Sequence, residues 1–168
     1  MVADWAWIGI DPGKQGAIAC ATCEHDTSVF SMPPTKREQY ELLDSIRGEY
    51  PGLHWVCCIE KVGNFFPSQN PAMDLKRVGA LLKLRQHKGE LIGFLVSLGV
   101  AIDEVMPRVW QKSVCGKLPR GQSSASIKSR KHAIRDKMQD LYPDLKLTLN
   151  NADAVAILTY CKRRYGGQ

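Results

Sequence analysis

Three acidic side chains stand where apolar segments of the chain end or begin. Asp11 closes the apolar run that starts at Trp5, and Glu60 closes the run that starts at His54. Asp153 lies near the start of the last apolar run of the sequence. A carboxylate at the end of a buried strand is destabilised by desolvation unless it is paired or binds a cation. Because carboxylates are preferred ligands of hard divalent cations, we predict that the three acids form one metal site.

Each of these acids also has an ordinary structural explanation. Asp11 can cap the turn that contains Gly13, and Glu60 can form a surface ion pair with Lys61. Asp153 suits the first turn of a helix, where an acid interacts favourably with the helix dipole. These explanations stay open, but they do not account for two acids that end apolar strands, since buried carboxylates are rarely left unpaired. We therefore prefer a shared metal site.

The pattern of apolar residues divides the 168-residue chain into strands and helices that can position these acids. Strands are predicted over residues 5–11, 16–23, 27–32, 54–60 and 101–106. Helical segments are predicted over residues 36–48, 72–98, 108–114, 124–141 and 151–164. Short turns join the first three strands, which should be antiparallel, whereas helices separate the later strands, which should pair in parallel. We predict an α/β fold: one domain over residues 1–168, with a five-stranded mixed sheet that has helices on both faces.

Positive charge is concentrated in one segment of the chain. The net charge is +6, which favours a polyanionic partner such as nucleic acid. Between Met106 and Tyr142 there are nine Lys or Arg residues and two acids. Phosphate contacts from such side chains position DNA without reading its sequence. The predicted DNA contacts are Arg108, Gln111, Lys112, Lys117, Arg120, Lys128, Arg130 and Lys131. A solvated helix face is the alternative, and the scarcity of acids argues against it.

The six cysteines are expected to be reduced, because they lie mostly within apolar strand or helix patterns. Cys20 and Cys23 have the spacing of half a zinc site, but no second pair stands at a suitable distance. The sequence contains no apolar run of about 18 residues or more, so we expect no membrane partner. The protein is expected to be soluble and intracellular, with the compartment left open.

Four segments, in this order, resemble RuvC-type Holliday-junction resolvases of the ribonuclease H-like superfamily. They are Gly-Ile-Asp-Pro-Gly at 9–13, Ile-Glu-Lys-Val at 59–62, a strand, proline and basic turn at 105–112, and Asn-x-Ala-Asp-Ala at 150–154. The resemblance covers most of the chain, and the length also fits. It implies a ribonuclease H-like fold and an endodeoxyribonuclease that resolves four-way DNA junctions by paired symmetric nicks, in DNA recombination and repair.

The resemblance also implies the chemistry of the site. Two Mg²⁺ ions, with Mn²⁺ as a substitute, would be held by Asp11, Glu60 and Asp153 and would promote phosphodiester hydrolysis. The family usually has a fourth ligand about one helical turn before this aspartate, and Asn150 stands at that position. Its amide lacks the negative charge of an acid, which should weaken Mg²⁺ binding. Asn150 is either the natural residue or an inactivating substitution.

Two further groups of residues take roles from the same resemblance. Lys112 and Lys128 would lie close to the scissile phosphate as catalytic residues. Phe65 or Phe66, in a loop rich in turn formers that follows Glu60, would stack on bases at the junction centre. The alternative is that both rings fold back into the core.

The long predicted helix 72–98 contains Gly79, Gly89 and Gly93, although glycine inside a helix costs about 0.5–1 kcal/mol relative to alanine. Close packing must compensate for this cost. One interpretation is tight packing of the helix against the sheet. The other is the seam of a twofold homodimer, because RuvC-like enzymes dimerise through the corresponding helix. We prefer the homodimer, which would present two identical sites to a four-way junction.

Two other functions remain open. An RNA-processing nuclease of the same fold would carry similar acids, and the basic segment would suit RNA as well. A junction-binding protein with a metal site impaired at Asn150 would bind DNA without cleaving it. An actin-like ATPase also begins with a strand followed by Asp-x-Gly, but that fold needs two such domains and a much longer chain.

Overall fold

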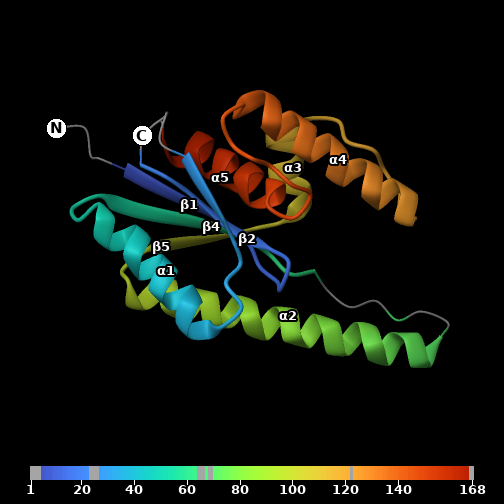
Figure 1. Ribbon diagram of the computed structural model, residues 1–168. Coiled ribbons are helices and arrows are strands. Elements are labelled where there is room, and N and C mark those ends of the chain that lie inside the picture. Colours follow the sequence, from blue (N-terminus) through green and yellow to red (C-terminus); the bar gives the residue numbers. More distant parts are fainter. Residues whose placement is uncertain (1–4, 23–26, 64–66, 68–69, 122, 167–168) are drawn as a thin grey trace.

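The computed structural model describes residues 5–22, 27–63, 67, 70–121 and 123–166. Within these residues, five strands form one mixed sheet in the order β3-β2-β1-β4-β5 (Figure 1). The strands are β1 (Trp5–Asp11), β2 (Ala17–Ala21), β3 (Thr27–Ser31), β4 (His54–Glu60) and β5 (Ala101–Val105). The first three strands form an antiparallel meander, while β1, β4 and β5 run parallel. The predicted five-stranded mixed sheet is confirmed, and the strand that ends in Asp11 lies at its centre.

Helices cover both faces of this sheet in the part of the chain that the structure describes. They are α1 (Lys36–Glu49), α2 (Pro71–Ser97), α3 (Pro107–Cys115), α4 (Ser124–Leu141) and α5 (Ala152–Tyr165). One face is covered by α1 and α2, and the other by α3, α4 and α5 (Figure 1). The predicted α/β class is therefore confirmed, and the predicted element boundaries differ from those in the structure by two residues or fewer.

Alternation along β1 explains why both faces of the sheet are buried. Ile8 and Ile10 pack into the core with α1 and α2, whereas Trp7 packs into the core with α3, α4 and α5. Gly9 lies beneath α5: a Cβ atom there would stand 2.2 Å from the backbone nitrogen of Leu158 and 2.5 Å from the carbonyl oxygen of Ala154. No larger residue fits, so α5 lies directly on β1. This close approach brings the first turn of α5, which holds Asp153, beside the central strand.

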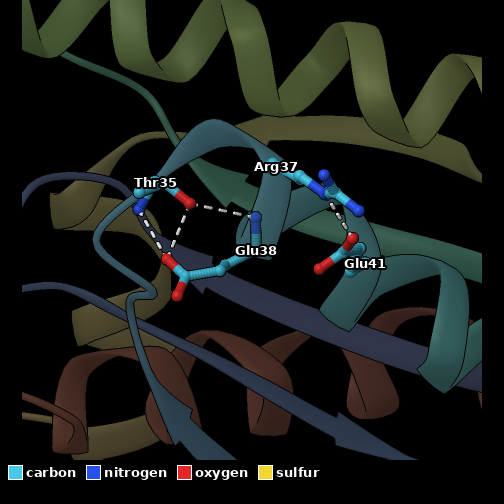
Figure 2. A network of polar contacts seen from close by, with 4 residues as sticks. All are labelled: Thr35, Arg37, Glu38 and Glu41. Carbon is cyan, nitrogen blue, oxygen red and sulfur yellow. Dashed lines mark hydrogen bonds and ion pairs between the residues drawn. The ribbon is translucent and has the colours of Figure 1, made fainter.

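The start of α1 is fixed by a capping box (Figure 2). The backbone nitrogen of Glu38 donates to Thr35 Oγ1 at 3.2 Å, and Glu38 Oε2 accepts from the backbone nitrogen of Thr35 at 3.0 Å. Arg37 Nε donates to Glu41 Oε1 at 2.7 Å on the exposed side of the same turn (Figure 2). The capping box satisfies donors at the start of α1. Gln39, the next residue in the same turn, faces inward and is only 5% exposed.

α2 extends beyond the sheet and is mostly exposed (Figure 1). Its buried residues are Leu91 and Leu95, both near its C-terminal end. Among the described residues, and apart from the backbone of α2 itself, a Cβ atom on Gly79, Gly89 or Gly93 would meet nothing within 4 Å. The interpretation that these glycines pack tightly on the sheet is therefore wrong, because leucines make that contact and the glycines face open space. The homodimer seam stays a prediction.

The described cysteines Cys20, Cys57, Cys58, Cys115 and Cys161 are free thiols. Cys161 Sγ donates a weak hydrogen bond to the carbonyl oxygen of Val56 at 3.7 Å, which ties α5 to β4. Cys23, the second half of the zinc-like spacing, lies outside the described residues. Among the described helices, none combines the length and apolar composition that a membrane span requires.

Candidate active site

Asp11 and Glu60 occupy matching positions at the ends of neighbouring strands. β1 and β4 are parallel, and Ile10 lies opposite Ile59 in their register. The next residue of each strand is an acid, so the two carboxylates emerge side by side at one edge of the sheet. Asp153 comes to the same edge from the first turn of α5. The packing of α5 over Gly9 therefore positions the third acid next to the two strand ends.

The pKa values of all three carboxylic acids are raised above their ordinary values. The pKa of Asp11 is raised to about 8: burial is the largest cause, the negative charges of Glu60 and Asp153 add to it, and Lys131 opposes it. Burial also raises the pKa of Glu60 to about 7, with a further contribution from Asp153, and it raises the pKa of Asp153. An acid with a raised pKa is one whose negative charge lacks compensation. The site therefore favours protons or cations at this edge of the sheet.

Trp110 holds the side chain of Glu60. Its indole Nε1 donates a hydrogen bond to Glu60 Oε2 at 2.9 Å, and this bond lowers the pKa of Glu60 against the effect of burial. The ring is fully buried in α3, so the direction of the bond is fixed by core packing. The sequence placed Trp110 in the basic turn, but nothing there indicated that its ring would reach β4. The sequence analysis did not predict this contact with a candidate site residue.

Lys131 of α4 is the lysine whose charge acts on all three acids. It lowers the pKa of Asp11, Glu60 and Asp153, and Arg130 also lowers that of Asp153. Both basic residues were predicted as DNA contacts, but Lys131 was not predicted as part of the acidic site. A partly buried lysine beside three acids balances part of their charge.

The two lysines predicted to be catalytic, Lys112 and Lys128, are more exposed than Lys131. Lys112 lies on α3 and Lys128 on α4, and both side chains are exposed. Their place near a scissile phosphate stays a prediction.

Asn150 lies in the turn that precedes α5 and is exposed. Its backbone nitrogen donates to Thr148 Oγ1 at 3.3 Å. The neighbouring Asn151 is committed to the turn itself, since its Oδ1 accepts from the backbone nitrogen of Thr148 at 2.7 Å and its Nδ2 donates to the carbonyl oxygen of Lys146 at 3.3 Å. Of the two asparagines, Asn150 is the exposed residue, whereas the side-chain amide of Asn151 is bonded within the turn. Its role as a fourth metal ligand stays a prediction.

A basic hollow opens between α3, the segment 116–120 and α4. Its volume is 570 Å³. The polar side chains that line it are Arg108, Gln111, Lys112, Lys117, Arg120 and Arg130. The structure thus brings six of the predicted DNA-contacting residues together around one depression. Phe65 and Phe66, predicted to stack on bases, lie outside the described residues.

The donor set of the acidic site suits a hard divalent cation, because it consists of carboxylate oxygens whose charge is only partly balanced. In the described part of the chain, however, no group of three or more His, Cys, Asp or Glu side chains is arranged to hold a metal ion. The acids therefore share their charge, but as they stand in the described residues they do not form a ligand group.

Two solved structures of RuvC from Thermus thermophilus have a similar fold. One has a TM-score of 0.52 and 18% sequence identity, and the match covers 96% of this chain and 96% of that chain. The other, T. thermophilus RuvC in complex with a Holliday junction substrate, has a TM-score of 0.56 and 17% identity, with 96% of each chain covered. The chain therefore has a RuvC-like fold. Comparison of the sequence with family models and with curated proteins finds no match.

Proposed function

We propose that the protein is a Mg²⁺-dependent, structure-specific endonuclease that cuts four-way DNA junctions. The observation that carries this proposal is the set of partly buried acids with raised pKa values, Asp11, Glu60 and Asp153, at one edge of the sheet. A RuvC-like fold and a basic hollow formed by α3, α4 and the segment between them support the same conclusion. Acids whose pKa values are raised by burial and by one another are candidates for a functional site.

The metal would be held by Asp11, Glu60 and Asp153, with the amide oxygen of Asn150 as a neutral fourth ligand. When bound, two Mg²⁺ ions would supply an activated water and neutralise the charge of the phosphate that is cut. The chain's own residues have separate tasks. Trp110 restrains the direction of Glu60 through its hydrogen bond, as residues that hydrogen-bond to metal ligands commonly do. The positive charge of Lys131 lowers the proton affinity of the acids and so favours their metal-binding form.

The basic hollow would bind the sugar-phosphate backbone of the substrate. Arg108 and Lys112 from α3 lie across it from Arg130 of α4. Arg130 also lowers the pKa of Asp153, so its charge acts on both the hollow and the acidic site. A phosphate backbone bound in the hollow would thus lie close to the three acids. Such contacts recognise shape and charge, and they would make binding strongly dependent on salt concentration.

A homodimer would match the near-twofold symmetry of a four-way junction and would make paired, symmetric nicks. The proposed seam is the exposed side of α2. Its apolar side chains Leu75, Leu82 and Val96, which are spaced by multiples of seven residues and so share one side of the helix, are 75%, 60% and 64% exposed. Exposed apolar side chains gathered on one long helix are typical of an interaction surface.

Cleavage of a synthetic four-way junction in Mg²⁺ tests the proposal. The wild type should nick two opposed strands, and Asp11→Asn and Glu60→Gln should abolish nicking while still binding the junction. The matched control is Asp44→Asn on α1, an exposed acid on the opposite face of the sheet, which should cut normally. Duplex DNA and structured RNA of equal length are the comparison substrates. Faster cleavage of the RNA would replace the proposal with an RNA-processing nuclease of the same fold.

A junction-binding protein without cleavage activity is the second candidate. Two observations favour it: Asn150 offers no charge, and the acids are not arranged as a ligand group in the described residues. Tight junction binding without nicking in Mg²⁺ or Mn²⁺, unchanged by Asn150→Asp, would support this candidate. Nicking that appears or increases in Asn150→Asp would support the endonuclease with Asn150 at a ligand position.

A further inference from the structure

The loop between β1 and β2 holds Asp11 in a tight backbone arrangement. Gly13 has a φ of +129°, which favours glycine, and its carbonyl oxygen accepts from the backbone nitrogen of Gly16 at 3.0 Å. A Cβ atom on Gly16 would stand 2.0 Å from the carbonyl oxygen of Asp11. The loop therefore folds back on Asp11 itself. Any contact that fixes Gly13 also fixes the backbone from which the Asp11 carboxylate projects.

His87, in the middle of α2, makes such a contact. The backbone nitrogen of Gly13 donates to His87 Nδ1 at 3.0 Å, across 74 positions of sequence. The other ring nitrogen, Nε2, lies 3.1 Å from Gln39 Oε1. Because the Gly13 amide can only donate, Nδ1 is the acceptor, and the proton is assigned to Nε2, which donates to Gln39. The contact with Gly13 therefore requires a neutral ring with one defined tautomer.

Gln39 extends this arrangement to a second fixed point. Its Nε2 donates to the carbonyl oxygen of Pro33 at 2.8 Å, and its side chain is buried. Its backbone nitrogen donates to the carbonyl oxygen of Thr35, the N-cap residue of α1, at 3.0 Å. Three hydrogen bonds therefore connect the β1–β2 loop, α2, α1 and the segment before α1. Burial lowers the pKa of His87, which agrees with the neutral ring.

α1 and α2 are also joined by contacts that do not involve His87. Tyr40 and Phe94 join the two helices by an edge-to-face ring contact at 5.7 Å, and Lys36 forms an ion pair with Glu90 at 2.6 Å. The hydrogen bond from Gly13 is directional and reaches the loop of the candidate active site instead. A role in the loop therefore explains the position of His87 better than a role in helix packing.

We propose that His87 is a positioning residue of the active site: by fixing Gly13, it sets the direction in which Asp11 presents its carboxylate to the metal. This inference takes the bound metal from the proposed function. The placing of Gly13 by His87 rests only on the hydrogen bonds described above. His87 contacts neither metal nor DNA in this proposal. Its loss should therefore act on metal affinity and leave junction binding unchanged.

A matched pair of amide substitutions separates the two hydrogen bonds of the ring. In His87→Asn, the amide oxygen takes about the place of Nδ1 and can accept from Gly13, while the bond to Gln39 is lost. In His87→Gln, the amide nitrogen takes about the place of Nε2 and can donate to Gln39, while the bond from Gly13 is lost. Each variant leaves one partly buried polar group unpaired, so both should lose similar stability in urea unfolding.

The readouts are Mn²⁺ affinity, from the electron paramagnetic resonance signal of free Mn²⁺, and hydrogen exchange at the Gly13 amide. His87→Gln should weaken Mn²⁺ binding by about 10- to 100-fold, the usual effect of losing an outer-shell partner, and should speed exchange at Gly13. His87→Asn should stay close to the wild type in both. Junction binding in Ca²⁺ should be equal in all three proteins.

Equal Mn²⁺ affinities in the two variants, or a weaker affinity in His87→Asn than in His87→Gln, would overturn the positioning role. If the wild type binds no Mn²⁺, the proposed metal-dependent function fails on its own. Hydrogen exchange at the Gly13 amide then tests whether His87 positions the loop. Faster exchange in His87→Gln alone would still support the positioning of the loop, and equal exchange in both variants would overturn it.

Discussion

Asp11 should make the stability of the metal-free protein depend strongly on pH. Burial and the charges of Glu60 and Asp153 raise its pKa from an ordinary 3.8 to about 8. Between these two values the folded protein keeps a proton that the unfolded chain releases, so raising the pH favours the unfolded chain. Each pH unit in this window contributes about 1.4 kcal/mol. At pH 7 the folded protein should therefore be less stable than at pH 4 by on the order of 4 kcal/mol.

The substitution Asp11→Asn removes this proton exchange and keeps the size of the side chain. Near pH 4 the variant and the wild type should be about equally stable, because both carry a neutral group there. Near pH 7 the variant should be the more stable of the two, by up to about 4 kcal/mol without metal. A smaller pH dependence should remain in the variant, because the pKa of Glu60 is also raised.

Urea unfolding in a chelator, followed from about pH 4 to about pH 8, measures this difference. Asp44→Asn, an exposed acid on α1, is the control and should follow the wild type. Added Mg²⁺ should stabilise the wild type most at the upper end of the range, because the ion competes with the proton on Asp11. Parallel pH profiles for the wild type and Asp11→Asn would refute the reasoning, since Asp11 would then be an ordinary exposed acid.

Three further substitutions test the surroundings of the acids. Trp110→Phe removes the hydrogen-bond donor to Glu60, so the pKa of Glu60 should rise and the pH profile of cleavage should move to higher pH. Mn²⁺ affinity should fall by about 10- to 100-fold. An unchanged pH profile of cleavage would count against a role for this hydrogen bond. Lys131→Met should raise the pKa of the acids and lower cleavage near pH 7 more than Lys128→Met does, and the reverse order would indicate that Lys128 matters more to cleavage than Lys131. Asn150→Asp adds a charge and should tighten Mg²⁺ binding in calorimetry, whereas unchanged binding would remove Asn150 from the ligand set.

The strands and the convergence of two acids were predictable because they depend on local pattern and on a general rule of sheet geometry. Asp11 and Glu60 each end an apolar run, and parallel strands bring their carboxyl ends to one edge. The position of Asp153 beside these two acids was harder to predict, because it depends on α5 lying directly over Gly9. The sequence pattern predicted a helix there but not the face that it would present.

The contacts of Trp110, Lys131 and His87 were not predictable from spacing. Each comes from a helix that reaches the acids or their loop across a long separation in sequence, and the rotation of each helix decides which side chain faces inward. Lys131 and Lys128 lie about one turn apart on α4, and the pattern of charge alone does not distinguish them. The glycines of α2 show the same difficulty, because Gly89 suits packing on a sheet and an exposed seam equally well in sequence, and the structure leaves it exposed.

Anomalous diffraction from crystals grown with Mn²⁺ can show whether Asp11, Glu60 and Asp153 bind divalent metal together. We expect an anomalous peak in contact with Asp11 and with at least one of the other two carboxylates, and its loss in Asp11→Asn crystals. Ordered carboxylates with no peak between them at saturating Mn²⁺, or a peak held elsewhere on the protein, would contradict this expectation.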